Sequence, residues 1–265
     1  YINVDGPLQH LIDPNTSALD TIDWPDARDS SRIRGLRERT LKLRQETDYA
    51  IVLNLGNTTF ALSQRVRGFA ELLEDLLINP EFASGLMERV TDIVCDMASA
   101  AVGAVGDLVD AVSTADDLGI QTQPFMAPEL YRQMVKPYHA RLAATVHGLT
   151  DASFILHSDG AIRDLLPDLI DAGVDVLNPV QVNATGMSPG ELNREFGKDL
   201  CFWGGIDTQK VLPFGSPSDV AREVRNRVGD LGRDGGYVVA SVHNILADVP
   251  AENIEAMLTA VTGED

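Results

Sequence analysis

An imidazole and a carboxylate stand two residues apart where an apolar run ends, at His157 and Asp159. Side chains two residues apart in a strand project to the same face, so both groups can enter one site. A second apolar run ends at His243. Imidazole and carboxylate groups bind zinc and similar divalent ions, and a catalytic site needs about three such ligands with one position open. The three residues are therefore predicted to form a site, as metal ligands or as metal-free groups that hydrogen-bond a substrate; purely structural histidines are the remaining alternative.

Other side chains that could take part in catalysis or binding follow other apolar runs. Asp116 and Asp117 are adjacent carboxylates, and one can face the site as an acid, a base or a substrate anchor, while a turn or capping aspartate is the plain alternative. Asp207 projects beyond paired glycines that let the backbone approach a ligand. Trp203 either stacks on a flat ligand or packs in the core. Arg67 is a candidate for binding a carboxylate of the substrate.

The elements that position these groups are short runs rich in Val and Ile that alternate with segments of helical period. This alternation predicts β–α units around a parallel sheet. The expected strands are 50–55, 109–114, 153–157, 174–178, 200–204 and 237–242, and the expected helices include 79–105, 127–147 and starts at 188, 216 and 248. A doubly wound sheet and a (β/α)₈ barrel of the TIM type both fit six such units. Because nearly every predicted strand ends in polar residues, the barrel is favoured, since all its strands end at one mouth.

Composition limits the classes of partner. The chain has 265 residues and a formal charge of −19, from 21 basic and 40 acidic residues. This charge disfavours nucleic acids and anionic membranes as partners. The two cysteines, Cys95 and Cys201, fit no disulfide framework, which favours a cytoplasmic location. We also expect a single domain over 1–265 with an irregular arm over 1–40, and a homodimer.

Several ordered strings resemble the uroporphyrinogen decarboxylase superfamily, which includes the decarboxylase of haem synthesis and cobalamin-dependent methyltransferases. The strings are Arg-Gly-Phe-Ala-Glu-Leu-Leu-Glu-Asp-Leu (67–76), Asp-Asp-Leu-Gly-Ile-Gln (116–121), His-Ser-Asp-Gly (157–160), Gly-Val-Asp-Val-Leu-Asn-Pro-Val-Gln (173–181), Phe-Trp-Gly-Gly-Ile-Asp-Thr-Gln (202–209), Val-His-Asn-Ile (242–245) and Asp-Val-Pro-Ala-Glu-Asn-Ile (248–254). The resemblance implies a (β/α)₈ barrel with its site at the carboxyl-end mouth. It also implies two strands more than the six predicted, so the first strands are expected to be missing from this chain.

The resemblance further implies a role for each candidate residue. Methyltransferases of this superfamily that use a corrinoid typically bind zinc through His-x-Cys and a later Cys. The matching positions here hold His157, Asp159 and His243, a harder donor set that is less suited to thiols. Catalytic roles are expected for His157, Asp117, Asp207 and His243, and substrate contacts for Asp116, Asn178, Gln181, Trp203, Gln209, Asn244 and Arg67.

The function expected from the resemblance is methyl transfer between a cobamide and a small-molecule donor or acceptor, with a corrinoid protein as a partner. A decarboxylase is the first alternative, but its substrate carries eight carboxylates, and only Arg67, Arg163 and Lys210 lie near the predicted strand ends. A non-catalytic protein that binds a corrinoid or another small ligand is the second alternative.

Overall fold

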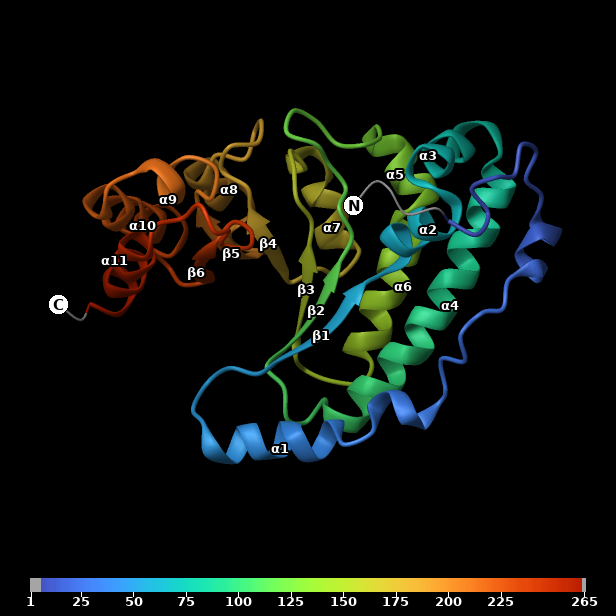
Figure 1. The fold of residues 1–265 in the computed structure, drawn as a ribbon, viewed down its shortest axis with the longest axis horizontal. Helices are drawn as coiled ribbons and strands as arrows, with labels where there is room; N and C mark the ends of the chain where they lie inside the picture. Colours follow the sequence, from blue (N-terminus) through green and yellow to red (C-terminus); the bar gives the residue numbers. More distant parts are fainter. Residues whose placement is uncertain (1–5, 264–265) are drawn as a thin grey trace. The chain divides into compact units, whose positions relative to one another are not determined.

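Six parallel strands alternate with helices in the computed structural model, which describes residues 6–263. The strands follow one another across the sheet in chain order, β1 to β6, as Figure 1 shows. Their bounds are β1 Val52–Asn57, β2 Ala111–Ala115, β3 Ser153–His157, β4 Val176–Val180, β5 Cys201–Ile206 and β6 Tyr237–Ser241. All six predicted strands are present, which confirms the parallel α/β architecture inferred from the alternation of apolar runs.

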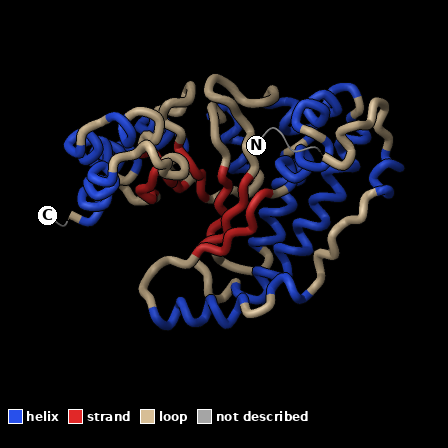
Figure 2. The backbone as a smooth tube through the Cα atoms, viewed as in Figure 1, coloured by secondary structure: helices blue, strands red, loops and turns tan. Residues whose placement is uncertain are grey.

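Helices precede the first strand, separate the strands from one another and follow the last strand (Figure 2). The α-helices are α1 Leu36–Glu46, α2 Thr59–Arg67, α3 Phe69–Ile78, α4 Pro80–Val105, α5 Pro128–Met134, α6 Lys136–His147, α7 Leu166–Asp171, α8 Pro189–Phe196, α9 Val211–Phe214, α10 Pro217–Leu231 and α11 Ala251–Thr262. Three 3-10 helices span Thr16–Thr21, Ser30–Ile33 and Arg163–Leu165. None of the helices among residues 6–263 combines the length and the apolarity that a membrane span requires.

The helix predicted over 127–147 is two helices, because the chain breaks at Val135. Pro137 lies in the first turn of α6, where it lacks the N–H that a continuous helix would bond. Other starts agree with the sequence: Ser216 caps α10 in a capping box with Asp219.

The chain divides into two compact units, which interleave along the sequence. The first unit consists of the chain up to Asp117 together with the segments Ala127–Ile155 and Asp171–Val174. The second unit consists of Leu118–Met126, Leu156–Ile170 and the chain from Asp175 onward. In the first unit β1 pairs with β2, and α4 packs on α6. In the second, β4 pairs with β5 and β5 with β6, while α10 packs on α11.

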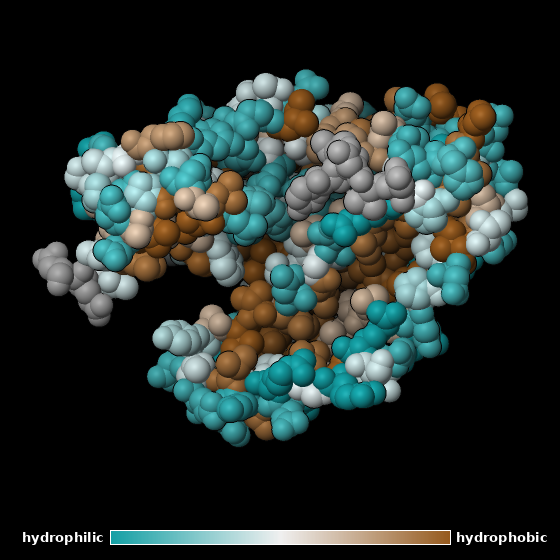
Figure 3. Space-filling view, in the orientation of Figure 1, coloured by the Kyte–Doolittle hydropathy of each residue, from teal (hydrophilic) through white to brown (hydrophobic). Residues whose placement is uncertain are grey.

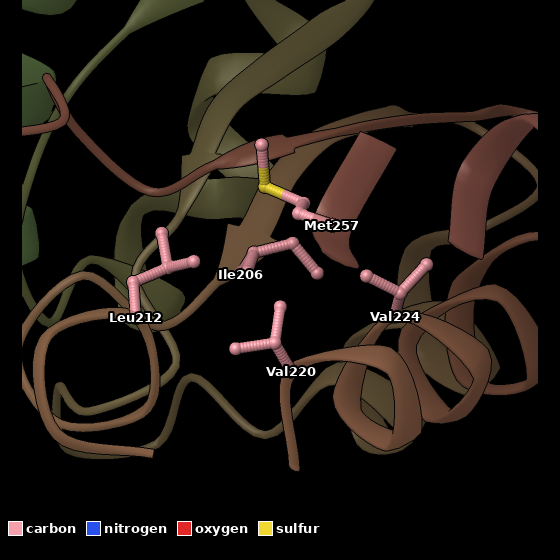
Figure 4. Packing of buried hydrophobic residues seen from close by; sticks show 5 residues of the cluster. All are labelled: Ile206, Leu212, Val220, Val224 and Met257. Carbon is pink, nitrogen blue, oxygen red and sulfur yellow. The ribbon is translucent and has the colours of Figure 1, made fainter. Parts of the chain in front are cut away.

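An apolar cluster fixes the outer helices of the second unit to its sheet. Ile206 at the end of β5 meets side chains from α9, α10 and α11, and Figure 4 shows them converging: Leu212, Val220, Val224 and Met257. All but Met257 are fully buried. Ile206 and Leu212 stand on either side of the loop that follows β5, so their packing in the cluster holds both ends of this loop in place.

The first unit has an apolar recess of about 260 Å³ between β1 and α4. Aliphatic side chains such as Leu53, Leu55, Leu62 and Val94 line it, and brown apolar atoms gather in this region in Figure 3. No imidazole or carboxylate is among the residues that line this recess. It therefore offers packing surface, and the chemically equipped site lies elsewhere.

Candidate functional site

Three groups that could bind a metal converge in the second unit. His157 ends β3, Asp159 follows it by two residues, and His243 comes shortly after β6. One ligand atom from each lies within 4.8 Å of the others. The Asp159 Oδ2 atom is 3.7 Å from the Nε2 atoms of both histidines. The two predicted strand ends therefore meet in space.

Asn178 sets the orientation of His157. The Nδ1 atom of His157 lies 2.6 Å from the Asn178 Oδ1 atom, at the neighbouring strand β4. A carboxamide oxygen only accepts hydrogen bonds, so Nδ1 carries the proton. In the neutral ring this leaves the lone pair on Nε2, the atom that faces Asp159. Metal-binding histidines are commonly held in this way by a carbonyl or carboxylate on the other ring nitrogen.

The donor set fits a divalent metal. Two imidazoles and one carboxylate make up the three protein ligands of many catalytic zinc sites. Bonds of about 2.0–2.2 Å in a tetrahedral arrangement place neighbouring donors about 3.4 Å apart, and the two nitrogen–oxygen distances of 3.7 Å are close to this value. The side chains of His157, Asp159 and His243 are 24%, 27% and 41% exposed. The trio is therefore open enough for a further ligand to approach.

A pocket of about 300 Å³ adjoins the trio. Asp159 and His243 line it together with Gln121, Gln181 and Gln209. The Gln181 Oε1 atom accepts a hydrogen bond from Gly160 N at 2.7 Å, and its Nε2 atom donates to Gln121 Oε1 at 3.0 Å. Gly160 has a φ of 101°, and a Cβ atom there would lie 2.4 Å from the Gly119 carbonyl carbon, so only glycine fits. The pocket wall beside the trio is a connected row of amides.

Asp207 shapes the loop that closes one side of this pocket. It is 5% exposed, and its Oδ1 atom accepts from Gln209 N, Lys210 N and the Asn183 amide. The Asp207 N–H in turn donates to Glu223 Oε1 at 3.0 Å. Burial raises the pKa of the Glu223 carboxyl. The contacts named here give Asp207 a structural part in positioning the loop, and its catalytic role stays a prediction.

Two expected substrate contacts are buried in structural networks of the first unit. Asp116 is 0% exposed, and its carboxylate accepts from the first residues of α2, Phe60 N and Ala61 N, and bonds His139. A carboxylate at a helix start satisfies N–H groups that have no partner within the helix. Arg67 is 4% exposed and pairs with Asp75 at 2.6 Å. The contacts described here make both residues internal anchors, and their roles as substrate contacts stay predictions.

The remaining candidates keep their roles as predictions. Asp117 is partly buried in the first unit, Trp203 is partly buried on β5, and Asn244 is exposed beside His243. Gln181 and Gln209 line the pocket as expected of substrate contacts. Sequence reasoning missed Gln121, which lies six residues beyond β2, although the string 116–121 contains it.

Known proteins resemble most of this chain. The family model of uroporphyrinogen decarboxylase (URO-D) matches residues 11–263. A methylated-thiol–coenzyme M methyltransferase of Methanosarcina mazei is 24% identical over 243 residues, which are 90% of this chain and 61% of the relative. A uroporphyrinogen decarboxylase of Methylococcus capsulatus is 27% identical over 185 residues, 69% of this chain and 49% of the relative. The chain thus spans between about half and two thirds of the length of these relatives.

A solved structure has the same fold. It is a methyltransferase from Methanosarcina mazei, with a TM-score of 0.70 at 19% identity, over 88% of this chain and 64% of that one. This likeness supports the barrel type of α/β fold that the polar strand ends favoured. The matched range covers nearly all of the described residues, including the three residues of the trio. The chain therefore belongs to the uroporphyrinogen decarboxylase family.

Proposed function

We propose that this chain forms the catalytic site of a corrinoid-dependent methyltransferase, in which His157, Asp159 and His243 hold a divalent metal such as zinc. The observation that carries the proposal is the gathered trio, with the Nε2 lone pair of His157 directed toward Asp159. The partners of the reaction are a cobamide, free or on a corrinoid protein, and a small-molecule methyl donor or acceptor. The methyltransferase relative and the methyltransferase structure support this branch of the family.

The residues of the site have separable tasks in this proposal. A bound divalent metal lowers the pKa of a coordinated water or thiol and polarises the groups that contact it. Asn178 keeps the proton of His157 on Nδ1, so that Nε2 is available as a donor. Gln181 and Gln209 orient the substrate from the pocket wall. Methyl transfer requires the nucleophile in line with the methyl carbon, and rigid positioning of this kind supplies a large part of the rate.

A decarboxylase is the second candidate, because one relative with that activity is 27% identical over 185 residues. A substrate with many carboxylates requires several cations around the site. Arg67 is buried against Asp75, and Arg163 pairs with Glu191 and Glu195. Two of the three basic residues near the predicted strand ends are thus already neutralised, which favours methyl transfer.

Metal content and methyl transfer test the proposal together. Full-length protein purified without chelator is analysed for metals and then assayed for demethylation of methylcobalamin with methoxy, methylamine and thiol compounds. We expect about one divalent metal per chain and a loss of both metal and activity in His157→Ala. Failure to demethylate methylcobalamin or to methylate cob(I)alamin with any of these compounds would refute the transferase. Activity on uroporphyrinogen would establish the decarboxylase instead, and absence of metal under every loading condition would refute the metal site.

A further inference from the structure

Apart from a metal held by the trio, the pocket beside it has no cationic lysine or arginine side chain in its lining. Ten residues line it, and none of them is a lysine or an arginine. Its ionisable groups are Asp159 and His243, and the rest of its polar lining is neutral: Gln121, Thr208, Gln181 and Gln209. The part of a substrate that extends away from the trio therefore meets amides and a hydroxyl.

Hydrogen bonds hold the side-chain amides of Gln181 and Gln121 in fixed orientations. The row runs from Gly160 N through Gln181 to Gln121, and the Gln121 Nε2 atom donates to the Asn183 carbonyl at 2.5 Å. Each carboxamide offers two N–H hydrogens and two lone pairs, so the row retains both donors and acceptors for a ligand. A wall of this kind suits uncharged polar groups, which can use donors and acceptors alike.

Two arginines of the second unit are engaged in contacts outside the pocket lining, whereas Lys210, which follows the lining residue Gln209, is exposed and is not among the lining residues. Arg163 pairs with Glu191 and Glu195 on α8. Arg227 donates to the Gly205 carbonyl and pairs with Asp230. An anionic substrate tail would thus find no guanidinium among the residues that line the pocket, and the formal charge of −19 repels anions over a longer range.

We infer that the pocket selects small polar substrates whose tail is uncharged or cationic and discriminates against anionic tails such as sulfonates. This inference rests on the proposed function for the identity of the site, and it adds the substrate class.

Three probes that share a methoxyethyl group and differ in charge test the inference: 2-methoxyethanol, 2-methoxyethyl-trimethylammonium and 2-methoxyethanesulfonate. Their binding to zinc-loaded full-length protein is measured by ligand-observed NMR, without any corrinoid. We expect the sulfonate to bind about tenfold more weakly than the other two probes. A sulfonate that binds as tightly as the alcohol overturns the inference, and so does the absence of binding by all three probes.

A matched pair of variants at Gln209 assigns the effect to this pocket. Gln209 is exposed, lines the pocket and lies outside the amide row; Gln209→Lys and Gln209→Glu both remove its carboxamide, so the two variants differ from each other in the charge at the pocket rim. Gln209→Lys should strengthen sulfonate binding about three- to fivefold, and Gln209→Glu should weaken it. Equal sulfonate binding in both variants overturns the inference. If this charge ranking holds but no methyl transfer occurs, the proposed function fails while the substrate class stands as a property of the pocket.

Discussion

Replacement of Asn178 by Ala should weaken metal binding without unfolding the protein. The substitution removes the acceptor of the 2.6 Å bond to His157 Nδ1. A partly buried neutral hydrogen bond contributes about 0.5–1.5 kcal/mol. Loss of the group that orients a metal-binding histidine typically lowers metal affinity about 10- to 100-fold. The two figures overlap at about tenfold, or about 1.4 kcal/mol, and this is the expected loss.

Zinc affinity is measured by competition with a chromophoric chelator at pH 7, and cobalt spectra report the coordination of the site. Asn178→Asp keeps an acceptor oxygen and should bind zinc at least as tightly as the wild type. Asn193→Ala is the matched control, since it also removes one hydrogen-bonded carboxamide within the same unit, in this case one that donates to the Asp230 carbonyl and has no contact with the trio. Unchanged affinity in Asn178→Ala, or an equal loss in Asn193→Ala, would show that Asn178 does not orient a ligand.

Three further predictions concern the second unit. Ile206→Ala removes a fully buried side chain from the cluster of Figure 4 and should lower the free energy of unfolding by about 2–5 kcal/mol in urea denaturation; a loss below 1 kcal/mol would contradict the packing. Ser216→Ala deletes the cap of α10 and should lower the free energy of unfolding by about 1 kcal/mol. Hydrogen bonds from Ser216 lower the pKa of Asp219 to about 2. The stabilisation by Asp219 should therefore be present above about pH 4 and disappear as the pH falls toward 2. The pKa of Glu223 is shifted the other way, upward, so the folded state loses stability as the pH rises above the ordinary glutamate value of 4.5. The free energy of unfolding of Glu223→Gln should therefore rise relative to that of the wild type as the pH increases from there, and a difference that does not change with pH would contradict this.

Strand positions were predictable because strands covered on both faces are continuously apolar and end at polar residues. The run 153–157 was placed to the residue, and the ends of the other strands differ from the prediction by at most two residues. The break at Val135 was missed because the helical period continues across it, although Pro137 was a readable sign.

Site residues were predictable where the position of a residue at a strand end determined that its side chain points toward the site. His157, Asp159 and His243 were selected for this reason, and the structure brings them within 4.8 Å. The same rule does not say which way the side chain of Asp116 turns, because a residue after a strand can face the interior as well as the site. The Asp116 side chain instead completes the amino end of α2, and a sequence does not reveal which N–H groups will lie within its reach.

The sequence by itself determined the alternation of strands and helices, the negative charge and the residue types at each strand end, because these follow from local pattern and composition. Tertiary structure alone decided which of those residues meet. His157 and His243 are 86 residues apart, and only the parallel arrangement of the strands brings both toward Asp159. It also decided that Asn178 fixes the ring of His157 and that Arg67 is an internal ion pair. Hydrogen bonds between distant side chains depend on distances of a few tenths of an ångström, which spacing along a chain does not encode.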